Sequence, residues 1–170
     1  MLFLLDANVL IDANRDYYPL DGVPEFWEWL IYQGEQGSVK IPIEIYEEIT
    51  DGKKDELASW MKRLEVRDAL LLDQEADINL VQEVVRKGYS ENLSDTELQQ
   101  LGRDPFLISY ALFPELNGSV CVVTTEISKP SKKRANKHVP DVCATFSITS
   151  RNAFEFSKIL GFRTGWKNYI

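Results

Sequence analysis

The sequence predicts an α/β protein, a three-layer α/β/α sandwich built around a central, mostly parallel sheet. Two continuous apolar stretches, 2–5 and 119–124, have the composition of strands that are buried on both faces. Segments in which apolar residues recur at helical spacing separate these and other strand-like segments. Strands that are separated by helices pair in parallel and are covered by helices on both faces. A length of 170 residues is typical of one domain, so we expect a single domain over 1–170.

Proline and glycine mark the predicted elements in the first half of the chain. Pro24 and Pro42 fit the first turns of helices, where the missing N–H costs no hydrogen bond. Gly34, Gly37 and Gly52 follow the two helical patterns that these prolines begin, as expected of residues that end helices. The predicted elements are a strand over 2–5, a helix from Pro24 to Gly34, a strand over 39–41, a helix from Pro42 to Gly52, a helix over 55–63 and a strand over 69–72.

Capping residues mark the second half. Ser94-Asp-Thr-Glu97 has the pattern of a capping box, in which two reciprocal hydrogen bonds close a helix start. Asp104 is placed to cap a helix that Pro105 begins. The predicted elements are a helix from Ile78 that stops at Gly88, helices from Ser94 and Asp104, a strand over 119–124, a short helix from Pro140, a strand over 147–149 and a helix from Asn152 to Gly161.

The composition excludes several classes of protein. Apolar residues make up 44% of the chain and charged residues 27%, which is the balance of a soluble globular protein. No apolar run approaches the roughly 20 residues of a membrane-spanning helix, and the opening Met-Leu-Phe-Leu-Leu is too short for a signal peptide. Two cysteines and one histidine exclude a Cys- or His-rich zinc site, so oxygen ligands would have to hold any metal. We expect a cytoplasmic protein with no membrane partner.

Charge is distributed unevenly along the chain. The formal net charge of −8 argues against binding to polyanions through overall charge alone. One segment is nevertheless basic over ten residues and could hold an RNA backbone, although a solvated loop would have the same composition. The candidate RNA-binding residues in this lysine-rich segment are Lys129, Lys132, Lys133, Arg134 and Lys137, beside His138.

Acidic and hydroxyl residues stand where the two most apolar strands are predicted to end. In parallel sheets, ligands bind beyond the carboxyl ends of the strands. Asp6 follows the first strand directly, and Thr124, Thr125 and Glu126 follow the other. A carboxylate at the rim of a buried strand is costly unless a partner or a metal compensates its charge. Asp6 therefore indicates a site, although it could instead cap a helix over 8–14.

Other acidic residues have two interpretations each. Asp104 and Asp141 stand at predicted helix starts, where capping alone would account for them. Glu48 borders the buried face of its predicted helix, whereas Glu47 should point further outward, and most helical glutamates are simply solvated. Asn8 could orient Asp6 or bind a phosphate, but it is also a common turn residue.

Four segments together resemble the PIN-domain ribonucleases, whose best-known members are the VapC-type toxins of toxin–antitoxin pairs. The segments are Leu-Leu-Asp6-Ala-Asn8-Val-Leu-Ile, Pro-x-x-x-Tyr-Glu-Glu48-Ile, Asp104-Pro-Phe-Leu-Ile-Ser-Tyr-Ala and Val-Val-Thr124-Thr-Glu. A later Val-Pro-Asp141-Val-Cys resembles an uncharacterised PIN-like branch. The resemblance implies an α/β/α fold whose acidic residues bind Mg²⁺ or Mn²⁺ at the strand ends. It implies Asp6, Glu48, Asp104 and Asp141 as metal ligands, with Thr124 and Asn8 as further catalytic residues.

Metal-assisted hydrolysis gives each of these residues a role. Divalent ions supply a nucleophilic water and relieve charge on the leaving oxygen, and Mg²⁺ prefers carboxylates. Asp6 and Asp104 would be principal ligands, Glu48 a ligand or base, and Thr124 a contact to phosphate or water. Asp141 would hold a second metal, or the first through water. The family pattern Thr-x-Asp or Thr-x-Asn reads Thr124-Thr125-Glu126 here, so Glu126 competes with Asp141 for that role.

These observations predict a metal-dependent endoribonuclease that acts on RNA, with the toxin of a toxin–antitoxin pair as one form of it. The resemblance also implies an antitoxin protein and a homodimer as candidate partners. The alternative is a PIN-like module that binds RNA or a protein with weak or no catalysis. An aspartyl-phosphate phosphatase ranks lower, because that chemistry wants a second Asp where this chain has Asn8.

Overall fold

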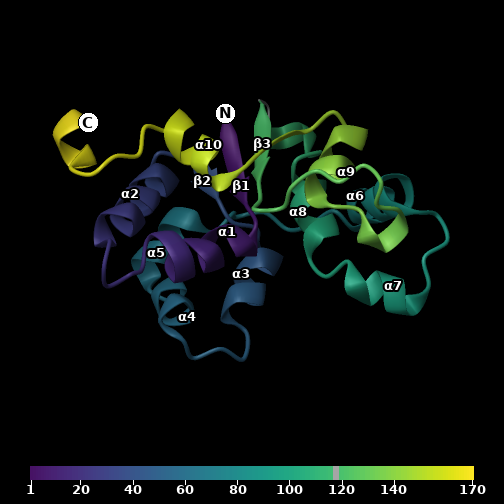
Figure 1. Ribbon diagram of the computed structural model, residues 1–170, viewed down its shortest axis with the longest axis horizontal. Coiled ribbons are helices and arrows are strands. Elements are labelled where there is room, and N and C mark those ends of the chain that lie inside the picture. Colours follow the sequence, from purple (N-terminus) through teal and green to yellow (C-terminus); the bar gives the residue numbers. More distant parts are fainter. Residues whose placement is uncertain (117–118) are drawn as a thin grey trace.

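The computed structural model in Figure 1 describes residues 1–116 and 119–170. Its sheet contains β1 (Leu2–Leu5), β2 (Val39–Lys40), β3 (Val120–Val123) and β4 (Thr149–Arg151) in the order β2-β1-β3-β4. Every neighbouring pair is parallel, which confirms the predicted α/β fold with a parallel central sheet.

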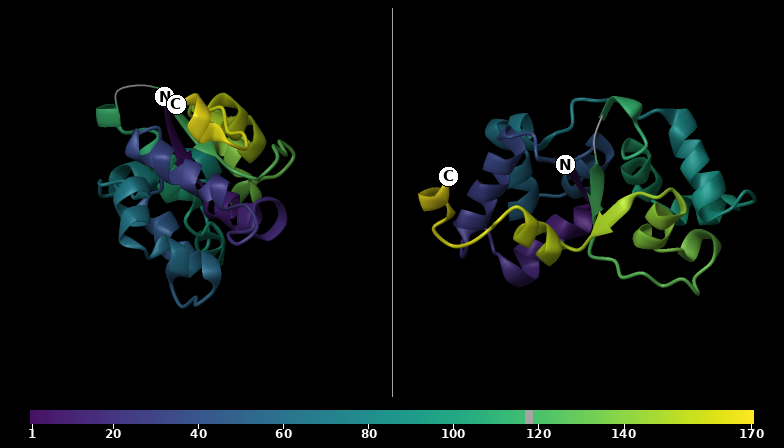
Figure 2. Two further views of the ribbon diagram at one scale, coloured as in Figure 1. Left: turned by 90° about the vertical axis from the view of Figure 1, so that its left-hand side faces the viewer. Right: turned by 90° about the horizontal axis from the view of Figure 1, so that it is seen from above.

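Helices cover both faces of this sheet, as a three-layer sandwich requires. Figures 1 and 2 show α2 and α5 on one side of the strands and α6, α8 and α9 on the other. The helices are α1 (Ala7–Asp12), α2 (Pro24–Glu35), α3 (Ile43–Thr50), α4 (Glu56–Met61), α5 (Leu64–Leu70), α6 (Ile78–Glu83), α7 (Asp95–Gln100), α8 (Asp104–Tyr110), α9 (Val139–Thr145) and α10 (Ala153–Ile159). Two π-helical turns, Ala13–Tyr17 and Val84–Tyr89, continue α1 and α6, and short 3-10 turns occupy Pro114–Leu116, Arg134–Asn136 and Trp166–Tyr169.

The register of the central strands brings the predicted strand ends together. Leu5 is paired with Val123, so the next residues along the two strands, Asp6 and Thr124, leave the sheet side by side. The Asp6 N–H donates to the Val123 carbonyl at 2.9 Å, which extends the pairing to the edge of the sheet. The carboxyl edge of β1 and β3 is therefore the place to look for the site.

The core is continuous and rich in aromatic side chains. Trp27 and Trp29 of α2 are almost completely buried, so they belong to the core. Phe156 of α10 packs against Phe3 of β1 with ring centroids 5.3 Å apart and against Trp29 at 5.6 Å. Such aromatic contacts hold α10 and α2 together on the same face of the sheet.

Some predicted elements differ in the structure. The strand expected over 69–72 is wrong, because α5 continues to Leu70 and only Leu71 bridges Ile41 at the edge of the sheet. The strand expected over 147–149 is shifted to Thr149–Arg151, because Ser147 lies in a turn with a φ of 57°. Gly34 does not end α2: a Cβ there would lie 2.6 Å from the Ala69 carbonyl oxygen, so glycine allows α2 and α5 to approach closely.

The capping predictions have mixed outcomes. The Ser94–Glu97 capping box is present, and Asn152 and Glu155 form a second one at α10. Asp104 does not cap its helix, because it is the first residue of α8 and its side chain makes no capping bond. Within the described residues, no helix combines the length and apolar composition needed to cross a membrane.

Candidate functional site

Asp6 lies at the carboxyl end of β1, where it is only 3% exposed. Its Oδ2 accepts a hydrogen bond from Thr124 Oγ1 at 2.7 Å, and it makes no capping bond to α1. Thr124 Oγ1 in turn accepts from the Glu126 N–H at 3.2 Å. Thr124 therefore fixes one oxygen of the buried carboxylate and also shapes the start of the loop that carries Glu126.

Asp104 begins α8 and lies half-buried beside Asp6. Its carboxylate hydrogen-bonds to none of the residues that the structure describes. Burial, together with the negative charges of Asp6, Glu126 and Glu48, raises the pKa of Asp104 to about 8. The Asp104 carboxylate thus has three negatively charged neighbours, and none of the groups that shift its pKa is a cation.

The pKa of Asp6 is shifted by some of the same causes. Its pKa is raised to about 6, because burial and the charges of Glu48 and Glu126 outweigh the hydrogen bond from Thr124, which lowers it. Four side chains from separate elements therefore act on one another. We call Asp6, Glu48, Asp104 and Glu126 the acidic cluster.

Glu48 and not Glu47 contributes to the acidic cluster from α3. The Glu48 charge acts on both buried aspartates. Glu47 Oε2 instead lies 3.4 Å from Arg103 Nη2, in an ion pair. The expectation that Glu47 points further outward than Glu48 is wrong in terms of exposure, because Glu48 is exposed and Glu47, paired with Arg103, is half-buried.

The structure separates the two acids that competed for the fourth position. Glu126 acts on Asp6 and Asp104, and its Oε2 also accepts from the Val139 N–H of α9 at 2.6 Å. Asp141 accepts hydrogen bonds from the Ser128 hydroxyl and from the Lys129 N–H, the latter at 2.8 Å. Asp141 therefore holds the start of the lysine-rich segment and is not among the carboxylates that act on Asp104.

The acidic cluster has the chemistry, although not yet the geometry, of a divalent cation site. Carboxylate and hydroxyl oxygens are the ligands that Mg²⁺ and Mn²⁺ prefer. Within residues 1–116 and 119–170, no three acidic, histidine or cysteine side chains are arranged so that they could hold one ion together. Binding would therefore require the carboxylates to turn toward a common point, where a cation would offset the repulsion between their charges.

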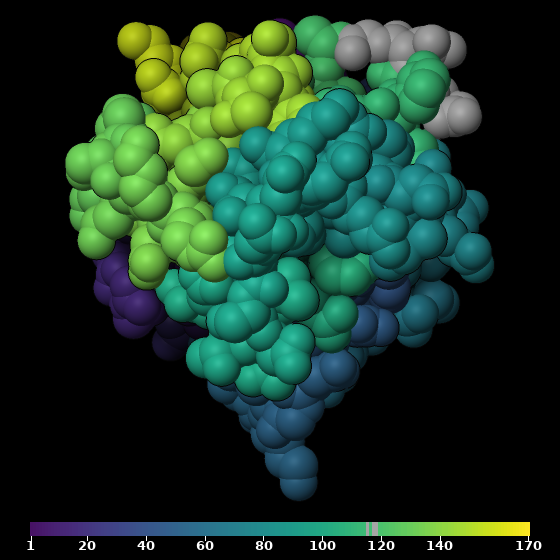
Figure 3. Space-filling view, turned by 90° about the vertical axis from the view of Figure 1, so that its right-hand side faces the viewer, coloured from purple at the N-terminus to yellow at the C-terminus, as the bar shows by residue number. Residues whose placement is uncertain are grey.

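Other predicted residues have distinct surroundings. Asn8 is exposed on α1. In the lysine-rich segment, Arg134 forms two contacts of 2.7 Å with Glu97, and Lys137 Nζ donates to the Gly88 carbonyl at 2.6 Å. These contacts tie the lysine-rich segment to α7 and to the turn Val84–Tyr89. Figure 3 shows the lysine-rich segment (green) beside the part of the chain that contains this turn and α7 (teal). Lys129, Lys132 and Lys133 are exposed as well, and unlike the exposed Arg134 their side chains form no hydrogen bond or ion pair with the residues that the structure describes.

Tyr89 is a feature of this region that the sequence did not indicate. It ends the π-helical turn Val84–Tyr89 and is 4% exposed. Its hydroxyl is buried and has no hydrogen-bond partner among the described residues. Asp104, Glu126 and Asp6 are among the charges that act on it. No local sequence pattern marks Tyr89, because it follows Gly88 at what looks like an ordinary helix end.

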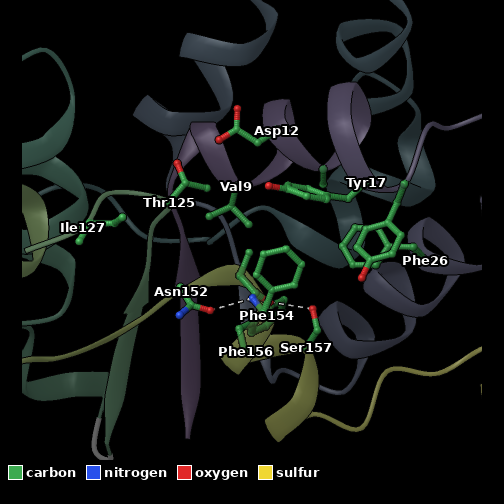
Figure 4. Close-up of a pocket in the computed structure, with 13 residues that line it drawn as sticks. Val9, Asp12, Tyr17, Phe26, Thr125, Ile127, Asn152, Phe154, Phe156 and Ser157 are labelled. Carbon is green, nitrogen blue, oxygen red and sulfur yellow. Dashed lines mark hydrogen bonds between the residues drawn. The ribbon is translucent and has the colours of Figure 1, made fainter.

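An apolar pocket of about 360 Å³ lies beyond the loop after β3. Figure 4 shows Thr125 and Ile127 of this loop along one side and the rings of Tyr17 and Phe154 along another. Tyr17 and Phe154 are both exposed and meet edge to face, with ring centroids 5.0 Å apart. The pocket thus offers exposed aromatic surface, and its lining includes Thr125 and Ile127, which are next to Thr124 and Glu126 in the sequence.

Comparison with known proteins gives a family but no function. The sequence model of the family described as "Domain of unknown function (DUF4411)" matches residues 3–164. Neither a curated protein nor a solved structure matches the chain. The function therefore has to be inferred from the site itself.

Proposed function

Since the chain belongs to the DUF4411 family, whose description assigns no function, we propose from its acidic cluster that it is a metal-dependent endoribonuclease. It would hydrolyse RNA phosphodiester bonds with Mg²⁺ or Mn²⁺. The resemblance of four sequence segments to the PIN-domain ribonucleases supports the same assignment.

One observation carries this proposal: the buried Asp6 at the carboxyl end of β1 and the half-buried Asp104 at the start of α8 are close enough for their charges to act on each other. Burial and neighbouring carboxylates raise the pKa of both Asp6 and Asp104. A protein that needed these residues only for packing would gain stability by replacing them with neutral side chains. Perturbed carboxyl groups gathered at a strand edge are typical of functional sites.

The residues of the site divide the work of hydrolysis. Asp6 and Asp104 would be the principal cation ligands, and Thr124 would hold Asp6 in place through its 2.7 Å hydrogen bond. Glu48 would bind the cation or accept a proton from the attacking water. Glu126 would be the fourth acidic residue of the site, the role for which it competes with Asp141. A bound Mg²⁺ or Mn²⁺ would supply an activated water and offset charge on the leaving oxygen.

The setting of this activity is also part of the proposal. Cys121 and Cys143 are free and buried, which suits a reducing compartment such as the cytoplasm. A role as the toxin of a toxin–antitoxin pair, an antitoxin partner and a homodimer stay predictions from the resemblance. Exposed Lys129, Lys132 and Lys133 are the residues best placed to contact an RNA backbone.

The decisive experiment measures RNA cleavage with and without the metal. A panel of structured and single-stranded RNAs would be incubated with the protein in Mn²⁺ and in EDTA. Asp104→Asn, prepared in parallel, should lose cleavage. Asp141→Asn is the matched control, because it also removes an aspartate charge at a helix start but lies outside the acidic cluster.

The outcomes separate the alternatives. Cleavage that needs Mn²⁺ and Asp104 but persists in Asp141→Asn would support the proposed site. Cleavage lost in Asp141→Asn and kept in Asp104→Asn would move the site to the position that the resemblance first gave it. Equal cleavage by all three proteins would indicate a contaminating nuclease and would remove the support for this function.

RNA binding without cleavage is a second candidate function, and the apolar pocket favours it. Exposed aromatic rings such as those of Tyr17 and Phe154 are surfaces on which unpaired bases stack. If this is the function, single-stranded RNA should bind in EDTA, and Phe154→Ala should weaken that binding. Ile159→Ala is a suitable control, because it removes an equally exposed apolar side chain of α10 that does not line the pocket.

A further inference from the structure

The buried Tyr89 hydroxyl lacks a hydrogen bond that its surroundings should provide. Buried polar groups in folded proteins are nearly always hydrogen-bonded, and an unpartnered one needs an explanation. The Tyr89 oxygen is inaccessible to solvent and has no partner among the residues that the structure describes. Asp104 is the first of the charged groups that act on it, ahead of Glu126.

The backbone around Tyr89 is held firmly against α9. A Cβ on Gly88 would lie 2.6 Å from Val142 Cγ1 and 3.1 Å from Phe146 Cε2, so only glycine fits at this contact. Lys137 Nζ donates to the Gly88 carbonyl at 2.6 Å. The π-helical turn Val84–Tyr89 is a local departure from α6, and such turns occur frequently at functional sites. The ring is therefore fixed in place, and the turn that carries it also packs against α8, the helix that Asp104 begins.

This hydroxyl can act only as a neutral hydrogen-bonding group. Burial raises the pKa of Tyr89 far above its usual value, and the nearby carboxylates raise it further. The phenol thus keeps its proton and can donate it to an anionic oxygen. Asp104 offers such an oxygen, because none of the described residues donates a hydrogen bond to its carboxylate.

We propose that Tyr89 is a positioning residue for the acidic cluster: its hydroxyl donates to one Asp104 oxygen when the cluster binds a divalent cation. The hydrogen bond leaves the other Asp104 oxygen turned toward the cation. Asp6 is already held in this way by Thr124 Oγ1 at 2.7 Å, so each buried aspartate would have one orienting hydroxyl. This inference rests on the proposed metal site and assigns it a residue that the family resemblance does not include.

Tyr89→Phe tests the inference because it removes only the hydroxyl. The dissociation constant for Mn²⁺ would be measured by electron paramagnetic resonance, and the Tm would be measured in EDTA. Hydrogen bonds to a ligating carboxylate are worth about 10–100-fold in metal affinity, so we expect Mn²⁺ binding to weaken by about that factor. The Tm of the metal-free variant should equal or exceed that of the wild type, because no hydrogen bond is lost.

Tyr110→Phe is the matched control. The Tyr110 hydroxyl is hydrogen-bonded, to the Gln74 carbonyl at 3.1 Å and to Glu44 at 3.5 Å, and it does not act on the acidic cluster. It should show the opposite pattern, with a lower Tm and unchanged Mn²⁺ affinity.

Each result decides the matter. If Tyr89→Phe binds Mn²⁺ like the wild type while Asp104→Asn does not, the inference about Tyr89 is wrong and the metal site stands. If Tyr89→Phe lowers the Tm in EDTA as Tyr110→Phe does, the hydroxyl is structural and the inference is also wrong. If the wild type fails to bind Mn²⁺, both the inference and the proposed function are overturned.

Discussion

At the scale of single residues, the site depends on carboxyl groups that are placed where their charge is unfavourable. Asp6 and Asp104 have raised pKa values of about 6 and about 8, and burial is the largest cause for both. An ordinary Asp titrates near 3.8. The metal-free protein therefore holds protons that the unfolded chain releases, which links its stability to pH.

This linkage predicts that metal-free stability falls as the pH rises. The pKa of Asp104 is about 8 in the native state, against an ordinary value of 3.8 in the unfolded chain. Between these two values the native state binds more protons than the unfolded chain, so the free energy of unfolding decreases as the pH rises. The stability that the protonated Asp104 contributes is complete below about pH 4 and is lost by about pH 8. Asp104→Asn has no such proton to lose, so in EDTA its Tm should gain on that of the wild type across this range.

Thermal unfolding at several pH values in EDTA would measure this difference. Asp141→Asn is the control, and its Tm difference from the wild type should not follow the same course. A loss of stability by Asp104→Asn that is equal at every pH would show that Asp104 is a structural residue.

Thr124 provides a second prediction at this scale. Thr124→Val keeps the shape of the side chain but removes both the donor to Asp6 and the acceptor for the Glu126 N–H. Leaving buried polar groups unpaired costs about 1–3 kcal/mol, so the free energy of unfolding should fall by that amount in urea titrations. Thr125→Val, at the half-buried neighbouring position, should change it far less, and an equal loss would contradict the special role of Thr124.

At the scale of elements, strand ends could be predicted and loop paths could not. The apolar runs at 2–5 and 119–124 located β1 and β3, and their parallel pairing then places Asp6 beside Thr124. The run at 69–72 was mistaken for a strand, because a short apolar run fits either a strand or a buried helix. Its Ala and Leu residues are good helix formers, which agrees with their place at the end of α5.

The same limit applies to the candidate site. The resemblance to the PIN-domain ribonucleases named Asp6, Glu48 and Asp104 together, whereas the pattern around each residue alone left a structural role open. The choice between Glu126 and Asp141 depends on the path of the loop between β3 and α9, which no local pattern encodes. Tyr89 approaches the site only because Gly88 packs against α9, a contact between residues far apart in the sequence.

The lysine-rich segment gives a prediction at this scale, since its basic residues have different surroundings. Replacing exposed Lys129, Lys132 and Lys133 with Ala should weaken RNA binding and reduce its salt dependence, because phosphate contacts release counterions. Arg134→Ala should instead lower the Tm, because Arg134 contacts Glu97 twice at 2.7 Å and donates to the Asn92 carbonyl. Affinity and salt slope would be measured by fluorescence anisotropy. Unchanged RNA binding in the triple variant would rule out a role for these lysines.

At the scale of the whole molecule, the overall negative charge has to be weighed against the apolar core that holds the fold together. The chain carries a formal net charge of −8, and its buried carboxylates gather at one edge of the sheet. The aromatic core does not depend on that charge, because Trp27 and Trp29 of α2 and Phe156 of α10 are buried among apolar side chains. Folding and cation binding should therefore be separable, with the metal-free protein folded and the cation adding stability.

This separation predicts a specific rise in Tm with Mn²⁺. A ligand that binds only the folded state adds about 2.7 kcal/mol at a hundredfold excess over its Kd, which corresponds to roughly 5–10 °C for a domain of this size. Added salt also stabilises an acidic protein by screening, so the reference is KCl at equal ionic strength. Differential scanning fluorimetry should show the excess Mn²⁺ effect in wild type and in Asp141→Asn but not in Asp104→Asn. If all three proteins respond alike, the cation acts on the overall negative charge, and the acidic cluster is not its site.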